Sequence, residues 1–147
     1  ILNFITAVAY YVMYFVTPPS FVFWILTFIG SMGFYAYMGI HFGAIGDAVD
    51  YGEYVSGVRC DGFLSSFVSV ANKAGGAAMP AIGAAVLAAL HYVANAQQSP
   101  EVLNAINWFI SLIPAILSTI NGFLYLMYPI STEKHKEIMD ELIARRQ

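Results

Sequence analysis

The sequence predicts an all-α membrane protein with four transmembrane helices. Of its 147 residues, 59% are hydrophobic and only 10% are charged, whereas a soluble domain carries roughly 45–50% apolar and about 25% charged residues. Four long apolar stretches follow one another, and none shows the sustained alternation of a membrane β-strand. Because a helix of ~20 residues crosses the bilayer core, four such helices account for most of the chain.

Turn-forming and polar residues bound the expected helices. Pro18 and Pro19 stop the first, since proline cannot continue a helix, and Pro129 follows the last. Residues 131–147 hold eight of the 15 charges and predict a tail that forms a short amphipathic helix at the membrane surface. The four spans, which together make up the segment 1–130, are expected at residues 1–17, 21–46, 62–93 and 102–128.

Lysine and arginine residues indicate the orientation in the membrane. They lie in the tail, as Lys134, Lys136, Arg145 and Arg146, and in the loop expected at 47–61, as Arg59. Loops rich in these residues stay in the cytoplasm. We therefore expect a multi-pass protein of the inner (plasma) membrane, surrounded by lipid bilayer, with a cytoplasmic C-terminus.

Composition excludes several classes of protein. The net charge of −3 and the absence of a basic patch argue against nucleic acid as a partner. Cys60 is the single cysteine, so no disulfide framework is expected. Neither it nor the three histidines have the spacing of metal ligands or of an activated nucleophile. We expect no cofactor, no metal site within this chain and no enzymatic activity.

The third span carries an unusual charge. Lys73 lies 11 residues beyond Gly62, well inside the expected span, with Ser69 and Asn72 on nearly the same helix face. A charge within the bilayer is costly and commonly marks a substrate or ion pathway. A structural ion pair is the alternative. No acid lies mid-span here, so we expect the counter-charge on helices outside this chain, of which these residues would form the C-terminal portion.

The second span is rich in aromatic side chains, among them Tyr35 and Tyr37, with His41 nearby. Aromatic faces beside hydroxyl groups suit sugar rings, which have apolar faces and polar edges. Ordinary interface packing is an equal alternative. His41 could carry a proton or simply donate a hydrogen bond.

Charged residues then gather in the expected loop. Carboxylates at the C-terminal end of a helix are disfavoured by its dipole, so their presence suggests a specific role. One role is a cytoplasmic latch that forms and breaks, and the alternative is a solvated loop of weak ion pairs. The cluster consists of Asp47, Asp50, Glu53, Arg59 and Asp61.

The exact string supports the latch. The segment reads Asp47-Ala-Val-Asp-Tyr-Gly-Glu-Tyr-Val-Ser-Gly-Val-Arg-Cys-Asp-Gly62. It resembles the D-x-x-D-Y-G-E-x-x-x-G-x-R-x-[D/E] loop of the glycoside–pentoside–hexuronide:cation symporters, which belong to the major facilitator superfamily. Lys73-Ala-Gly-Gly, a last helix ending in Tyr128-Pro129 and the charged tail follow in the same order as in that family.

The resemblance implies the last four helices of a twelve-helix carrier, with a cavity that opens alternately to each side. It implies that Lys73 lies near the sugar and the coupling cation, Na⁺ or H⁺, which the missing N-terminal half would mainly bind. It also implies that the charged loop helps close the cytoplasmic side. Two alternatives remain: a free-standing four-helix scaffold or assembly subunit, and a superfamily carrier for a non-sugar substrate.

Overall fold

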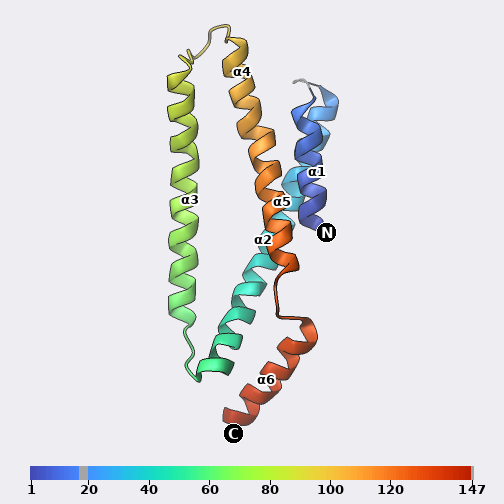
Figure 1. Cartoon of the computed structure of the whole chain (residues 1–147), viewed down its shortest axis with the longest axis vertical. Coiled ribbons are helices and arrows are strands. Elements are labelled where there is room, and N and C mark those ends of the chain that lie inside the picture. Colours follow the sequence, from blue (N-terminus) through green and yellow to red (C-terminus); the bar gives the residue numbers. More distant parts are fainter. Residues whose placement is uncertain (17–19, 147) are drawn as a thin grey trace.

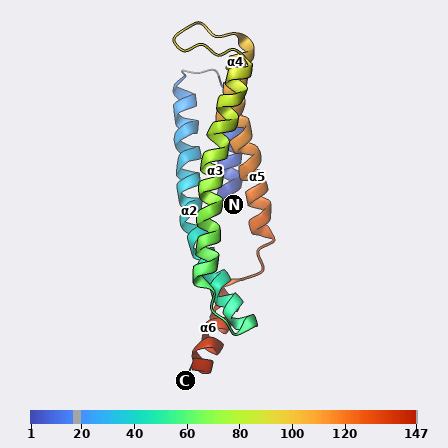
Figure 2. The same ribbon diagram turned by 90° about the vertical axis from the view of Figure 1, so that its left-hand side faces the viewer.

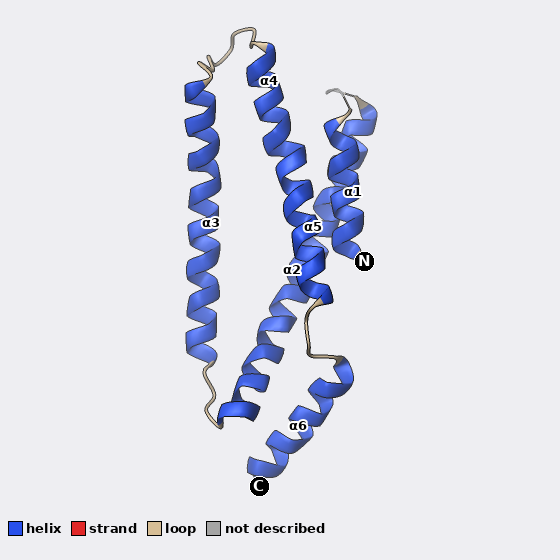
Figure 3. Cartoon of the chain, viewed as in Figure 1, coloured by secondary structure: helices blue, strands red, loops and turns tan. Residues whose placement is uncertain are grey.

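The computed structural model describes residues 1–16 and 20–146, and these contain helices and loops without strands (Figures 1 and 3). The predicted all-helical class is therefore confirmed. The first proline stop, at Pro18 and Pro19, lies outside the described residues. In chain order the elements are α1 (Leu2–Tyr14), α2 (Phe21–Ser56), α3 (Asp61–Ala89), α4 (Pro100–Asn107), the π-helical segment η1 (Trp108–Leu112), α5 (Ile113–Leu126) and α6 (Thr132–Arg146).

Two helical stretches of the described chain are long and apolar enough to cross a membrane. They are α2 and the continuous run from Pro100 to Leu126. Only 11% and 17% of the residues in their most apolar windows are buried, so they do not resemble the core helices of a soluble domain. Hydrophobic side chains are exposed over most of this surface, including Phe21, Trp24 and Phe28 on α2.

The long helices run up and down the longest axis of the molecule (Figures 1 and 2). The short connection between α2 and α3 lies at the same end as α6. The loop between α3 and α4 lies at the opposite end, as does the start of α2. The connections thus alternate between the two ends, as expected for successive spans of one bundle.

The tightest packing surrounds α1, which lies against α2 and α5. Glycines allow this close approach. A Cβ at Gly30 would lie 2.8 Å from Cζ of Tyr10, and one at Gly122 would lie 2.9 Å from Cζ of Phe4. A Cβ at Gly33 would overlap Oγ1 of Thr6. Small residues at helix interfaces of this kind are typical of membrane helices.

The π-helical segment η1 ends two residues before Pro114. Proline lacks the N–H that would bind the carbonyl of residue 110, and its ring crowds that carbonyl, so a wider turn relieves the clash. Ser111 is fully buried there and donates its O–H to the backbone oxygen of Asn107. The Asn107 amide donates to the carbonyl of Tyr14 at 3.0 Å, which satisfies a free carbonyl at the end of α1.

Several boundaries differ from those expected. The second helix continues past Gly46 to Ser56, so Asp47, Asp50 and Glu53 lie on a helix and not in a loop. Gly57 ends it with a left-handed backbone (φ 72°), and its N–H binds the Glu53 carbonyl at 2.8 Å. The remaining helices run over Leu2–Tyr14, Asp61–Ala89 and Pro100–Leu126, where 1–17, 62–93 and 102–128 were predicted.

Candidate functional site

A charged cluster joins the end of α2 to the start of α3. Arg59 lies in the short connection between the two helices, and its guanidinium binds carboxylates from both sides. Nη1 lies 2.8 Å from Oδ1 of Asp50 and 2.9 Å from Oε2 of Glu53, while Nε lies 2.6 Å from Oδ2 of Asp61. We call Asp50, Glu53, Arg59 and Asp61 the Arg59 cluster.

The planar fork of arginine explains this geometry, since its N–H groups can bind several carboxylates at once. The hydrogen bonds that Arg59 donates to Asp61, Glu53 and Asp50, in that order of importance, raise the pKa of Arg59, so the guanidinium stays charged at any physiological pH. Three carboxylates surround one cation, which leaves an excess of negative charge. Arg59 and Asp61 are exposed to solvent while Asp50 and Glu53 are partly buried, so the solvated contacts of the guanidinium can break and re-form at low cost.

Asp47 was predicted to belong to this charged group, but the structure places it elsewhere. Its Oδ1 lies 3.3 Å from Nδ1 of His135 on α6, and no bond joins it to Arg59 within residues 1–16 and 20–146. Along the same face of α2, the ammonium of Lys134 lies 5.8 Å from the ring centre of Tyr51. Asp47 therefore faces the tail helix.

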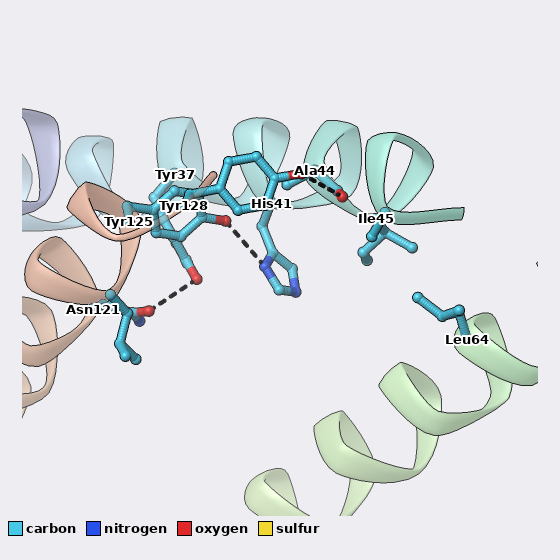
Figure 4. A pocket seen from close by; sticks show the side chains of 10 residues that line it. Tyr37, His41, Ala44, Ile45, Leu64, Asn121, Tyr125 and Tyr128 are labelled. Atoms are coloured by element: carbon cyan, nitrogen blue, oxygen red, sulfur yellow. Dashed lines mark hydrogen bonds between the residues drawn. The ribbon is translucent and has the colours of Figure 1, made fainter. Parts of the chain in front are cut away.

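A pocket of about 310 Å³ lies between α2, α5 and the first turn of α3 (Figure 4). Tyr37 donates its O–H to Oδ1 of Asn121 at 3.3 Å, and Nδ1 of His41 lies 3.3 Å from the Tyr125 hydroxyl. The lining residues are Tyr37, His41, Ala44, Ile45, Ala48, Leu64, Asn121, Leu124, Tyr125 and Tyr128.

The polar groups of this pocket pair across the two helices in a regular way. Tyr128 donates its O–H to the carbonyl of Ala44 at 3.2 Å. Residues 37, 41 and 44 thus meet residues 121, 125 and 128 at one constant offset in sequence. Such matching requires α2 and α5 to run parallel and in register. The Tyr37 and Tyr125 rings also meet edge to face, 5.5 Å apart.

The other predicted cavity residues lie outside this pocket. Tyr35 is 73% exposed, because two positions along a helix turn it by about 200° from Gly33, which faces α1. Ser69, Asn72 and Lys73 are exposed on α3, whose described residues include none that is buried. No bond joins Lys73 to any residue in 1–16 or 20–146, so a counter-charge within this part of the chain is not seen.

Sequence reasoning missed Asn121, Tyr125 and Tyr128 as pocket residues. Their spacing carried a signal, since the fourth span places Asn121, Tyr125 and Tyr128 at i, i+4 and i+7, and the second span places Tyr37 and His41 at i and i+4. Among the described residues, no group of three His, Cys, Asp or Glu side chains could hold a metal ion.

These features define a helical membrane protein with a charged cluster at one end. The MFS/sugar transport protein family matches residues 1–132. The chain belongs to this family, and within it to the glycoside–pentoside–hexuronide:cation symporters of the major facilitator superfamily, as the charged motif predicted. Its members are transporters and not enzymes.

Curated relatives agree with this assignment. A glucuronide carrier protein homolog of Escherichia coli is 34% identical over 81% of this chain and 26% of its own length. An isoprimeverose transporter of Lactiplantibacillus pentosus is 32% identical over 78% of this chain and 24% of its own length. A putative sulfoquinovose importer of Salmonella typhimurium is 25% identical over 87% of this chain and 27% of its own length. No solved structure matches the chain.

Proposed function

We propose that this chain forms the last four transmembrane helices of a cation-coupled symporter for a sugar or glycoside. The named relatives carry or import sugars and their derivatives, which supports this substrate class. The chain spans about a quarter of the length of these relatives, so the remaining helices would come from the rest of the same protein. Alternating access would then let the cation gradient, of Na⁺ or H⁺, drive uptake.

The arrangement of helix ends supports four spans. Successive connections lie at opposite ends of the molecule, and α3, with 29 residues, is about 43 Å long (Figure 1). This length exceeds the ~30 Å bilayer core. The end that holds Arg59 and α6 also holds the lysines and arginines of the chain apart from Lys73. We therefore propose that this end lies on the cytoplasmic side of the inner membrane.

The Arg59 cluster carries the proposal of a transport cycle. One guanidinium bridges the last turns of α2 and the first turn of α3, and its surplus carboxylate charge suits a cationic side chain from the other half of the carrier. Such contacts form when the cytoplasmic side closes and break when it opens. We assign the Arg59 cluster as part of the inner gate.

The substrate and cation cavity is proposed on two surfaces of the chain. One carries Lys73, Ser69 and Asn72, which are exposed on α3 and therefore free to meet the missing helices. The other carries Tyr35, exposed on α2, with Tyr37 and His41 in the pocket beside α5. In the pocket the ring nitrogen Nε2 of His41 makes no hydrogen bond to the described residues, so it can meet a sugar hydroxyl.

Uptake of radiolabelled glucuronides, pentosides and hexosides by cells that express the full-length carrier tests the proposal. We expect uptake of at least one glycoside, inhibited by a protonophore if H⁺ is coupled or by removal of Na⁺ if Na⁺ is coupled. A carrier that accumulates none of these compounds would contradict the sugar assignment. Uptake unaffected by either ion would contradict cation coupling.

A further inference from the structure

The tail helix α6 packs on the cytoplasmic end of α2, away from the Arg59 cluster. Ile138 and Leu142 are only 2% and 3% exposed where the two helices meet, and Val49 on α2 is 5% exposed. Burial of these aliphatic side chains favours a fixed contact. The buried aliphatic residues of α6 are thus turned toward α2.

Arg145 makes the most specific of the tail contacts. Its Nη1 donates to the backbone carbonyl of Tyr54 at 3.0 Å, and its guanidinium carbon lies 5.2 Å from the centre of the Tyr54 ring. Nη2 binds Oε1 of Glu141 at 2.6 Å, which holds the side chain in this orientation. A carbonyl in the last turn of a helix lacks an intrahelical partner, and a cation there also opposes the negative end of the dipole.

The contacted tyrosines are direct neighbours of the gate carboxylates. Asp50 precedes Tyr51 and Glu53 precedes Tyr54, and one residue corresponds to about 100° of rotation about the helix axis. One face of the α2 end therefore binds the tail while the adjacent face binds Arg59. Rotation of this segment by the tail would move both carboxylates relative to the guanidinium.

We propose that Arg145 is a positioning residue of the inner gate, which acts through Tyr54 to hold Asp50 and Glu53 in reach of Arg59. The inference rests on the proposed gate function of the Arg59 cluster. Loss of the tail contact would weaken the closed gate without removing any of its charges. Contacts of exposed guanidinium groups shift an equilibrium by about two- to fivefold, so the expected effect is modest but measurable.

Cys60 provides a native reporter, because it is exposed and adjoins Arg59. The full-length carrier, with any other cysteines replaced by serine, is placed in inside-out vesicles and treated with a membrane-impermeant maleimide. The rate of Cys60 alkylation is compared between the wild type, Arg145→Ala, Arg145→Lys and Arg59→Ala. Lys136→Ala is the matched control, since it removes the same charge from an exposed α6 residue that makes no hydrogen bond, ion pair or cation–π contact with α2.

We expect Arg145→Ala to raise the alkylation rate by about threefold, Arg59→Ala to raise it further, and Lys136→Ala to leave it unchanged. Arg145→Lys retains the charge but not the planar guanidinium, so its Cys60 alkylation rate should lie between those of the wild type and Arg145→Ala. In the Tyr54→Leu background the Arg145→Ala effect should become smaller but not vanish, because the ring contact is lost while the bond to the backbone carbonyl of residue 54 remains.

The outcomes separate the two proposals. If Arg145→Ala matches Lys136→Ala while Arg59→Ala raises the rate, the positioning role is wrong and the gate assignment stands. If Arg59→Ala leaves the rate unchanged, the gate assignment is wrong, and the positioning role that depends on it fails too. Equal amounts of each variant in the membrane establish that the rates report on the gate and not on folding.

Discussion

The contact between Gly33 on α2 and Thr6 on α1 yields the most direct test of the packing. Thr6 is 3% exposed, and its O–H donates to the carbonyl of Leu2 at 3.1 Å. A Cβ at Gly33 would overlap Oγ1 of Thr6 and lie 3.1 Å from its Cβ. Gly33→Ala must therefore displace the threonine side chain or separate the helices.

The expected cost follows from these contacts. Overpacking of a close interface costs about 1–3 kcal/mol, and loss of the Thr6 hydrogen bond adds about 1 kcal/mol. Replacement of a helical glycine by alanine stabilises the helix by ~0.5–1 kcal/mol, which offsets part of this loss. The net loss of about 1–3 kcal/mol should lower the thermal midpoint of the full-length carrier in detergent by a few degrees, roughly 2–5 °C.

Two further variants sharpen this measurement. Gly52→Ala, on the same helix but with no atom within 4 Å of the added Cβ, should keep the wild-type midpoint or raise it slightly. Thr6→Ala in the Gly33→Ala background removes the overlapping oxygen and should restore most of the loss. Equal midpoints for Gly33→Ala and Gly52→Ala would refute the proposed packing of α1 on α2.

Three other predictions follow from the sites described. Lys73→Ala should leave membrane insertion normal and strongly reduce accumulation of labelled glycoside, because an ionisable group within the membrane commonly marks a substrate or ion pathway; unchanged accumulation would remove Lys73 from the cavity. Asn107→Leu should destabilise the carrier by about 1–3 kcal/mol, because it removes the donor to the Tyr14 carbonyl; detergent melting curves that match the wild type would contradict this. Arg59→Lys should raise the Cys60 alkylation rate part of the way toward Arg59→Ala, since an ammonium cannot reproduce the fork that binds the cluster; identical rates for Arg59→Lys and the wild type would show that charge alone suffices.

Composition predicted the all-helical class, but it could not predict where α2 ends. The second helix was expected to end near Gly46, because the apolar stretch stops there and the acids begin. In the structure Arg59 binds Asp50 and Glu53 from beyond the helix, and the tail covers the neighbouring face. Arg59 belongs to the same local segment, but the tail residues come from a helix far along the chain, so the local sequence does not reveal that contact.

The candidate site was also predicted only in part. Tyr35 and Tyr37 are equivalent in composition, yet one is exposed and the other lies in the pocket beside α5. A two-residue separation places them on nearly opposite helix faces, and only the position of α5 decides which face is covered. The partner of Asp47 could not be predicted for the same reason, since His135 reaches it from a helix far along the chain.

Because α2 is long, a small tilt of this helix gives a large displacement at its C-terminal end. This helix of 36 residues packs against α1 at Gly33, and Glu53 lies some 30 Å further along its axis. A tilt of about 10° around that contact would displace the carboxylate by roughly 5 Å. Arg59 follows α2 by three residues and pairs with Asp61 of α3 at 2.6 Å, so a tilt this small is enough to separate the α2 carboxylates from the α3 end of the cluster. A slight adjustment of α2 around a bound ligand within the membrane can thus release charges that never touch that ligand.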